Sequence, residues 1–414
     1  MEFGEFILAH DTDDLASLAL SRSRFAAQVD DFDLALTTLE VRRKLRTKVP
    51  QWWAVPSLHY PFRLSGEQCS SAETARYKAA VALSALASPT TLADLTGGLG
   101  VDTWAFAQEF GEVLYNEMRP ELAAAAEFNF LELGLRNVAV RSRELRPGTL
   151  TDILGDFRPD ILFLDPARRS GDGRKMFRLE DCQPDVLQLL PELLSACPRV
   201  LLKLSPMADI TLVCMQLGCV KQVHVVAAEG ECKELLLLLE RDCEGPYSLT
   251  VYESGSVATI AGERGDAPKP SLCDSLSSAT PAAGTVLFEP GKALLKAGAF
   301  DWPCGFGLQK LGRHTHLYVG EAVPEALRPF GKCYQILEVL PLDKHSLKTV
   351  GQNYPQADVT ARNIPLTSDQ LRAKLQGKKP PSAASSRPVH VFGVHLDARQ
   401  ENLLLVCQKL VVAN

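Results

Sequence analysis

The sequence predicts an α/β fold built on a mostly parallel sheet, and three observations carry that prediction. A short apolar run, Thr91–Leu95, is typical of a buried strand; the glycine-rich stretch Thr96–Gly100 and a helical pattern over Val101–Phe110 follow it. A second strand, Glu112–Glu117, ends in a carboxylate. Two later apolar strands, at 222–227 and 234–240, have so short a connection that they must pair antiparallel. Strand, glycine-rich turn and helix together open a nucleotide-binding sheet.

The residues before this sheet are expected to be helical. Acidic residues at 30, 31 and 33 precede apolar residues at helical spacing, and basic residues follow at 42–48, which suits the helix dipole. The same basic run is also a candidate surface near a substrate entrance. A further helix is expected from an N-cap at Ser70 or Ser71 to Pro89.

The remaining strands of the sheet are predicted in chain order. Strand three begins at Asn137, strand four is Ile161–Leu164, and strand five is Val200–Leu204. Beyond 245 we expect a hairpin over 247–261, a polar linker over 262–284, a helix over Phe288–Phe300 and a last α+β domain. The expected domains are a helical segment 1–65, a sheet domain 66–245, a hairpin, linker and small module 246–330, and a terminal domain 331–414.

Composition limits the possible functions. The 414 residues carry a net charge of −6, with 46% apolar and 23% charged residues, which is typical of globular proteins. The 11 cysteines contain no Cys-x-x-Cys pair, which favours a reduced cytoplasmic protein and predicts no metal site. No secretory signal or membrane helix is expected. Residues 341–414 hold ten Lys and Arg against five Asp and Glu, a net +5, so the remainder carries −11.

The ligand-binding residues are predicted from the first two strands. Glu117 lies 19 residues after Gly98, where an acidic residue accepts hydrogen bonds from ribose hydroxyls. A dinucleotide fingerprint requires a third glycine where the chain has Thr103, which disfavours nicotinamide or flavin. The pattern Asp94-x-x-Gly97-Gly98-x-Gly100 with Glu117 instead resembles the cofactor loop of class I S-adenosylmethionine-dependent methyltransferases. That resemblance also implies Glu144, after strand three, as an acid near the adenine amine.

The candidate catalytic residues follow strand four. Asp165 and Pro166 stand at its carboxyl end, beside the glycine loop in such a sheet, and Arg168 and Arg169 come next. Asp165 could accept a hydrogen bond from an amine nucleophile or act as a base, and the arginines could hold phosphate or a base edge. Ser205 occupies the position after strand five where uracil-C5 RNA methyltransferases carry a cysteine, so a covalent mechanism is disfavoured.

Several blocks together resemble bacterial class I methyltransferases with a THUMP-like C-terminal domain. They are Gln68-x-Ser-Ser-x-Glu-Thr-Ala-x-Tyr-Lys, the Asp94 glycine loop, Asp165-Pro-Ala-Arg-Arg, Glu289-Pro-Gly-Lys-Ala-Leu-Leu-Lys-Ala-Gly-Ala-Phe and Ala361-Arg-Asn-Ile-Pro. The resemblance implies a Rossmann-like sheet closed by an antiparallel pair, S-adenosylmethionine as cofactor, an RNA substrate such as tRNA or rRNA, and a small ferredoxin-like module around 284–330. The alternatives are a methyltransferase acting on a small molecule or protein, and a non-catalytic RNA-binding protein on the same fold.

Overall fold

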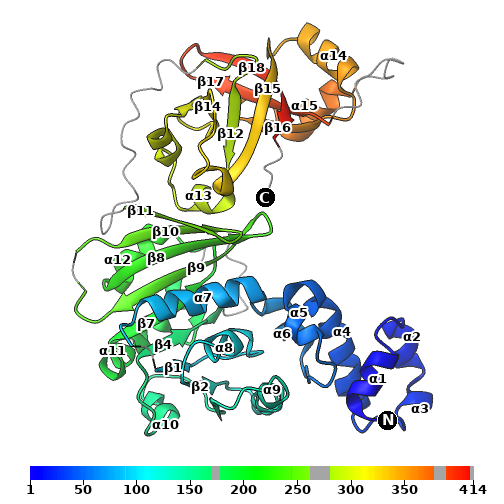
Figure 1. Ribbon diagram of the computed structural model, residues 1–414, viewed down its shortest axis with the longest axis vertical. Coiled ribbons are helices and arrows are strands. Elements are labelled where there is room, and N and C mark those ends of the chain that lie inside the picture. Colours follow the sequence, from blue (N-terminus) through cyan, green and yellow to red (C-terminus); the bar gives the residue numbers. More distant parts are fainter. Residues whose placement is uncertain (89, 169–177, 244, 262–279, 377–387, 411–414) are drawn as a thin grey trace. The chain divides into compact units, whose positions relative to one another are not determined.

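The computed structural model describes residues 1–88, 90–168, 178–243, 245–261, 280–376 and 388–410 (Figure 1). Within these, the chain forms two compact units. Unit 1 comprises mainly residues 1–226 and 233–248, and unit 2 comprises residues 227–232 together with most of the chain from 249 onward.

Unit 1 begins with short helices that have a small core of their own. The helices are α1 (Phe3–Ala9), α2 (Leu15–Leu20), α3 (Arg22–Phe25), α4 (Phe32–Lys48), α5 (Pro50–Trp53) and α6 (Arg63–Gln68). Phe6, Leu18 and Leu39 are among the buried residues that pack α1 and α2 on α4. The basic run on α4 is used in this packing, since Arg42 pairs with Asp11 at 3.3 Å and Lys44 pairs with Glu67 at 2.6 Å.

Seven strands of a nine-stranded sheet lie in unit 1, in the order β8-β9-β7-β4-β1-β2-β3. The parallel sheet with an antiparallel strand agrees with the predicted fold class. β1 pairs in parallel with β2 and β4, β4 pairs in parallel with β7, and β9 pairs antiparallel to β7. The parallel strands therefore end at one edge, where ligands bind in such sheets. The strands are β1 (Thr91–Asp94), β2 (Glu112–Asn116), β3 (Val138–Arg141), β4 (Ile161–Leu164), β7 (Arg199–Leu204), β8 (Val220–Ala228) and β9 (Glu231–Glu240).

Helices connect these strands, and a two-stranded ribbon follows β4. The helices are α7 (Ala72–Ser84), α8 (Val101–Phe106), α9 (Pro120–Glu132), α10 (Leu150–Leu154), α11 (Val186–Ala196) and α12 (Ile210–Leu217), and the ribbon is β5 (Ala167–Arg168) with β6 (Cys182–Gln183). All four residues of β4 are buried, as expected for a strand covered on both faces. Ser71 is the N-cap of α7, because its hydroxyl accepts a hydrogen bond from the N–H of Thr74 at 3.2 Å.

Unit 2 contains a second sheet in the order β13-β14-β12-β15-β18-β17-β16, packed on both faces. The second sheet and its helices comprise β12 (Val286–Pro290), α13 (Lys292–Lys296), β13 (Gln309–Lys310), β14 (Tyr318–Gly320), β15 (Gly331–Pro341), α14 (Lys344–Asn353), β16 (Asp358–Arg362), α15 (Ser368–Leu375), β17 (His390–Leu396) and β18 (Glu401–Lys409). The strands β10 (Ser248–Glu253) and β11 (Ser256–Ala261) belong to the nine-stranded sheet. Helices α14 and α15 cover one face through Val350, Leu371 and Leu375.

One element of unit 2 was predicted wrongly. The helix expected over Phe288–Phe300 is in fact the end of β12 followed by the short helix α13, because Phe288 pairs with Tyr318 of β14 and Cys333 of β15. Most of the predicted linker, residues 262–279, lies outside the described residues. In the described part of the chain, no helix is long and apolar enough to cross a membrane.

Candidate active site

The glycine loop between β1 and α8 is held tightly against its neighbours. Gly98 and Gly100 have positive φ angles of 55° and 92°, which L residues with side chains rarely adopt. A Cβ on Gly97 would lie 2.1 Å from the ring of Tyr115, and one on Gly100 would lie 2.8 Å from Phe130. A Cβ on Gly98 would have only the Thr96 carbonyl oxygen, 3.9 Å away, as a neighbour within 4 Å. The loop therefore packs closely on one side and leaves the backbone of Gly98 open on the other.

Glu117 lies directly after β2 and meets this loop. Its Oε2 accepts a hydrogen bond from the N–H of Gly98 at 3.1 Å, and its Oε1 accepts one from the N–H of Arg119 at 3.0 Å. The side chain is only 9% exposed. Its Oε1 also accepts a hydrogen bond from Nε of Arg119 at 3.4 Å. A carboxylate has about four lone-pair sites, so about one remains for a hydroxyl donor from a ligand.

Asp94 ends β1 beneath the loop and is fully buried. Its two oxygens accept hydrogen bonds from the N–H of Thr96 at 3.1 Å and from the hydroxyl of Thr103 at 2.6 Å. Burial raises the pKa of Asp94 to about 8, although these hydrogen bonds oppose the rise. Thr103, which occupies the place of the third fingerprint glycine, thus provides a partner for a buried acid.

Two residues that were not predicted from the sequence also position the loop. The hydroxyl of Tyr115 donates to the carbonyl of Gly98 at 2.6 Å. The side-chain amide of Asn116 donates to the carbonyls of Leu95 and Arg143, at 3.1 and 3.0 Å, and its Oδ1 accepts the N–H of Arg143. Asn116 therefore joins the end of β2 to the segments that follow β1 and β3. The sequence could have indicated both residues, because Tyr115 and Asn116 are polar groups in an otherwise apolar strand and directly precede Glu117.

Asp165 stands at the end of β4, beside the loop, as predicted. Its backbone N–H donates to the hydroxyl of Thr96 at 2.7 Å, which joins it to the segment after β1. Its side chain is 35% exposed. Nζ of Lys203, on β7, donates a hydrogen bond to its Oδ2.

Lys203 leads into a buried chain of charges that the sequence analysis missed. Its Nζ lies 3.9 Å from Oε2 of Glu234, and Oε1 of Glu234 lies 2.6 Å from Nζ of Lys78. Lys78 in turn lies 3.2 Å from Asp102, which accepts a hydrogen bond from the hydroxyl of Ser70 at 2.9 Å. A charged residue within an apolar strand, as Lys203 is within β7, signals a buried partner.

The other predicted site residues make no hydrogen bond to the glycine loop among the described residues. Pro166 is buried, and Arg168 pairs through its backbone with Cys182. Arg169 lies outside the described residues. Glu144, three residues after β3, is exposed and lies 3.6 Å from Nη1 of Arg146. The roles given to these residues, and the expected domain boundaries, stay predictions.

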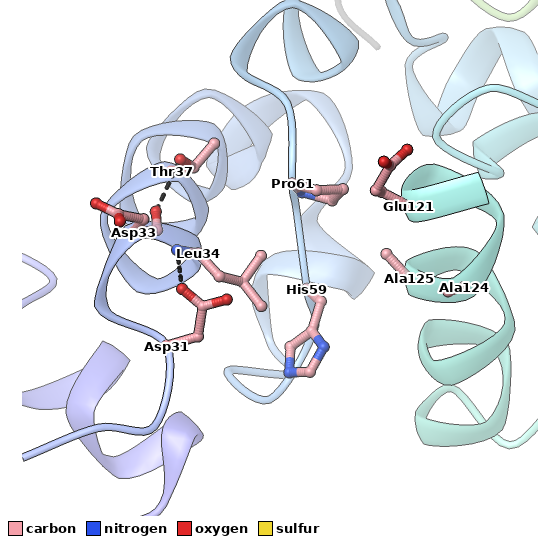
Figure 2. Close-up of a pocket in the computed structure, with 9 residues that line it drawn as sticks. All are labelled: Asp31, Asp33, Leu34, Thr37, His59, Pro61, Glu121, Ala124 and Ala125. Atoms are coloured by element: carbon pink, nitrogen blue, oxygen red, sulfur yellow. Dashed lines mark hydrogen bonds between the residues drawn. The ribbon is translucent and has the colours of Figure 1, made fainter. Parts of the chain in front are cut away.

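A cavity of about 430 Å³ lies elsewhere in unit 1, between the start of α4, the segment 59–61 and α9 (Figure 2). Asp31, Asp33 and Glu121 are among its lining residues, and none of the predicted site residues is. Two of these carboxylates already have structural partners: Asp31 caps α4 at the N–H of Leu34, and Asp33 pairs with Arg22. Nowhere in the described ranges do three His, Cys, Asp or Glu side chains gather so that they could hold a metal ion.

Comparison with known proteins identifies the class of this chain. Residues 331–409 match the family of THUMP domain-like sequences, and residues 287–326 match a ferredoxin-like domain family. A crystal structure of a candidate methyltransferase from Porphyromonas gingivalis W83 matches over 99% of this chain and 98% of its own, with 28% identity and a TM-score of 0.78. The chain is therefore a class I methyltransferase by fold, with a THUMP-like C-terminal domain, as predicted.

Other solved structures match only part of the chain. A precorrin-6y C5,15-methyltransferase from Geobacter metallireducens GS-15 is 13% identical, with a TM-score of 0.30, over 42% of this chain and 91% of its own. A 16S rRNA N2 G1207 methyltransferase from T. thermophilus, in complex with AdoMet and guanosine, is 14% identical, with a TM-score of 0.31. The match covers 41% of this chain and 42% of that one. No curated protein matches this chain.

Proposed function

We propose that this protein transfers a methyl group from S-adenosylmethionine to RNA by direct in-line displacement. The observation that carries the proposal is the arrangement of two carboxylates around one glycine loop. Glu117 is hydrogen-bonded to the loop at Gly98, and Asp165 is hydrogen-bonded to the loop's first residue, Thr96. We assign Glu117 to the methyl donor and Asp165 to the acceptor.

The loop fits this cofactor by its shape and its donor set. The open backbone face at Gly98 allows close approach of a ligand, and the remaining acceptor site of Glu117 suits a ribose hydroxyl. Gly97 and Gly100, packed on Tyr115 and Phe130, hold that face in place, and Asp94 supports it from below. Glu144 is proposed as a further acid, near the adenine amine. S-adenosylmethionine, when bound, supplies an electrophilic methyl group on a sulfonium.

Asp165 is the residue that we assign to the acceptor. In-line transfer requires the nucleophile to stand about 3–3.5 Å from the methyl carbon, and positioning alone can supply several kcal/mol. A carboxylate that accepts a hydrogen bond from an N–H nucleophile can fix that position and receive the proton. Ser205, after β7, accepts the N–H of Met207 at 3.2 Å, which suits a turn rather than a nucleophile. Pro166, Arg168 and Arg169 are proposed to shape the acceptor side.

RNA is the proposed substrate because of the C-terminal domain. The THUMP-like match covers residues 331–409, and residues 341–414 carry a net charge of +5. Three exposed lysines, Lys344, Lys348 and Lys374, lie on the helices α14 and α15, which pack against each other. Such a basic surface attracts a polyanion.

Calorimetry and nucleoside analysis test the proposal together. The protein should bind S-adenosylmethionine or its demethylated product and not NAD. Incubation with labelled methyl donor and bulk RNA from a strain lacking the protein should then label one nucleoside, identified by mass spectrometry. Tight NAD binding would overturn the cofactor assignment. Label in protein or small molecules, and none in RNA, would overturn the substrate assignment.

A further inference from the structure

Lys203 stands opposite Asp165 across two neighbouring strands. β4 and β7 pair Leu164 with Leu202, so the next two residues in the same parallel register are Asp165 and Lys203. Nζ of Lys203 donates to Oδ2 of Asp165, and its side chain is 14% exposed against 35% for Asp165. The ammonium therefore lies on the protein side of the carboxylate.

The ammonium of Lys203 has a second carboxylate partner, Glu234, on the buried side. Glu234 lies 3.9 Å away, its side chain is 4% exposed, and it is itself bound by the fully buried Lys78 at 2.6 Å. Burial lowers the pKa of Lys203, but the charges of Asp165, Glu234 and Asp102 outweigh this and raise it above its ordinary value. Lys203 therefore remains a hydrogen-bond donor.

This arrangement leaves one oxygen of Asp165 for another partner. Among the described residues, Oδ2 is bound by Lys203 and no residue donates a hydrogen bond to Oδ1. A carboxylate fixed at one oxygen presents the other in a defined direction, whereas a free side chain would rotate.

We propose that Lys203 is a positioning residue for the methyl-transfer reaction, which turns Oδ1 of Asp165 toward the acceptor nucleophile. The chain of charges through Glu234, Lys78 and Asp102 to Ser70 anchors Lys203, and it explains the residues Ser70 and Lys78 of the block before the sheet. The inference rests on the proposed function, since it gives Asp165 its acceptor role.

The kinetic test replaces Lys203 by Met and by Arg, in the full chain, with bulk RNA and labelled methyl donor. Lys203→Met should lower kcat by about 10²-fold, a typical cost of a misplaced reacting group. The KM for RNA and the Kd for the donor should stay within about threefold. Lys203→Arg, which keeps the charge and the donors, should recover about tenfold of the loss. Lys221→Met removes an exposed ion pair with Glu240 and should leave kcat unchanged.

A folded Lys203→Met variant with wild-type kcat would overturn the proposal, and so would parallel losses in kcat, KM and donor binding. A second measurement needs no substrate: acetylation of the intact protein, followed residue by residue by mass spectrometry. Lys203 should be acetylated about tenfold faster in Asp165→Asn than in the wild type, normalised to Lys221. Equal rates would overturn the pairing, also where Lys203→Met does not fold. If the wild type methylates no RNA, the proposed function fails. The acetylation rates still test the contact between Lys203 and Asp165 in that case.

Discussion

The backbone N–H of Gly98 donates a hydrogen bond to Oε2 of Glu117 over 3.1 Å. The glycine loop after β1 and the acid after β2 are thus joined directly by a hydrogen bond within the protein. A second bond, from the hydroxyl of Tyr115 to the carbonyl oxygen of Gly98, holds the next peptide group of the loop. The proposed cofactor site is therefore preorganised, which lowers the entropy cost of binding.

Removing the Glu117 carboxylate should weaken binding of S-adenosylmethionine. Glu117→Ala deletes a charged acceptor, at a cost of about 1.5–3 kcal/mol, which is about a 10- to 150-fold rise in Kd. Calorimetry with the donor measures it. Glu112→Ala, at the exposed start of the same strand, is the matched control and should bind normally. Equal affinity of wild type and Glu117→Ala would remove the ribose role.

Asp94 should make the folded protein less stable as the pH rises. Its pKa is about 8 in the folded state against an ordinary value of 3.8 for an exposed aspartate, so the folded state binds more protons than the unfolded state between about pH 4 and 8. Its contribution to stability is fully present below about pH 4 and is lost as the pH rises through 8. Urea unfolding at pH 5 and pH 8 should show a smaller loss for Asp94→Asn than for the wild type. Identical losses in both proteins would contradict this.

Asp165→Ala should separate catalysis from binding. Methyl transfer to RNA should be lost, because the acceptor has no hydrogen-bond partner, while RNA affinity and donor affinity stay near wild type. Filter binding and calorimetry measure the affinities, and labelled donor measures the transfer. The exposed Asp152 on α10 provides the control Asp152→Ala, which should transfer normally. Transfer by Asp165→Ala at the wild-type rate would exclude the acceptor role.

The exposed lysines of α14 and α15 should set the salt dependence of RNA binding. Each phosphate contact contributes a slope of about −0.7 on single strands, so Ala at Lys344, Lys348 and Lys374 together should flatten the slope by about 2. RNA titrations at several salt concentrations measure it. Lys332→Ala, also exposed in unit 2, is the control. An unchanged slope in the triple variant would place RNA binding elsewhere.

The parallel sheet could be predicted from the sequence because its strands are continuous apolar runs. Ile161–Leu164 is buried at every position, and the turn after Thr91–Asp94 needs the glycines that the sequence shows. Asp165 and Glu117 followed from the same logic, since parallel strands end at one edge. The prediction of a THUMP-like C-terminal domain came from the resemblance of sequence blocks and not from the periodicity of apolar residues.

The charge chain behind Asp165 could not be predicted in the same way. Three residues of this chain, Lys78, Glu234 and Lys203, lie far apart in the sequence. The pairing of β7 with β9 brings Lys203 near Glu234, and α7 adds Lys78 through its ion pair with Glu234. The helix expected at Phe288 failed for a related reason. Phe288–Pro290 pairs with distant residues of β14 and β15, so only Lys292–Lys296 remains helical.

The sheet of unit 2 has a consequence for how this part of the chain can be exchanged between proteins. The ferredoxin-like match ends at 326 and the THUMP-like match begins at 331, yet β15 pairs with β12 on one side and with β18 on the other. A cut between the two matches would leave β12 and β15 each with an unpaired edge. Transplanting either family block alone would therefore expose a strand edge that the other block covers in this chain.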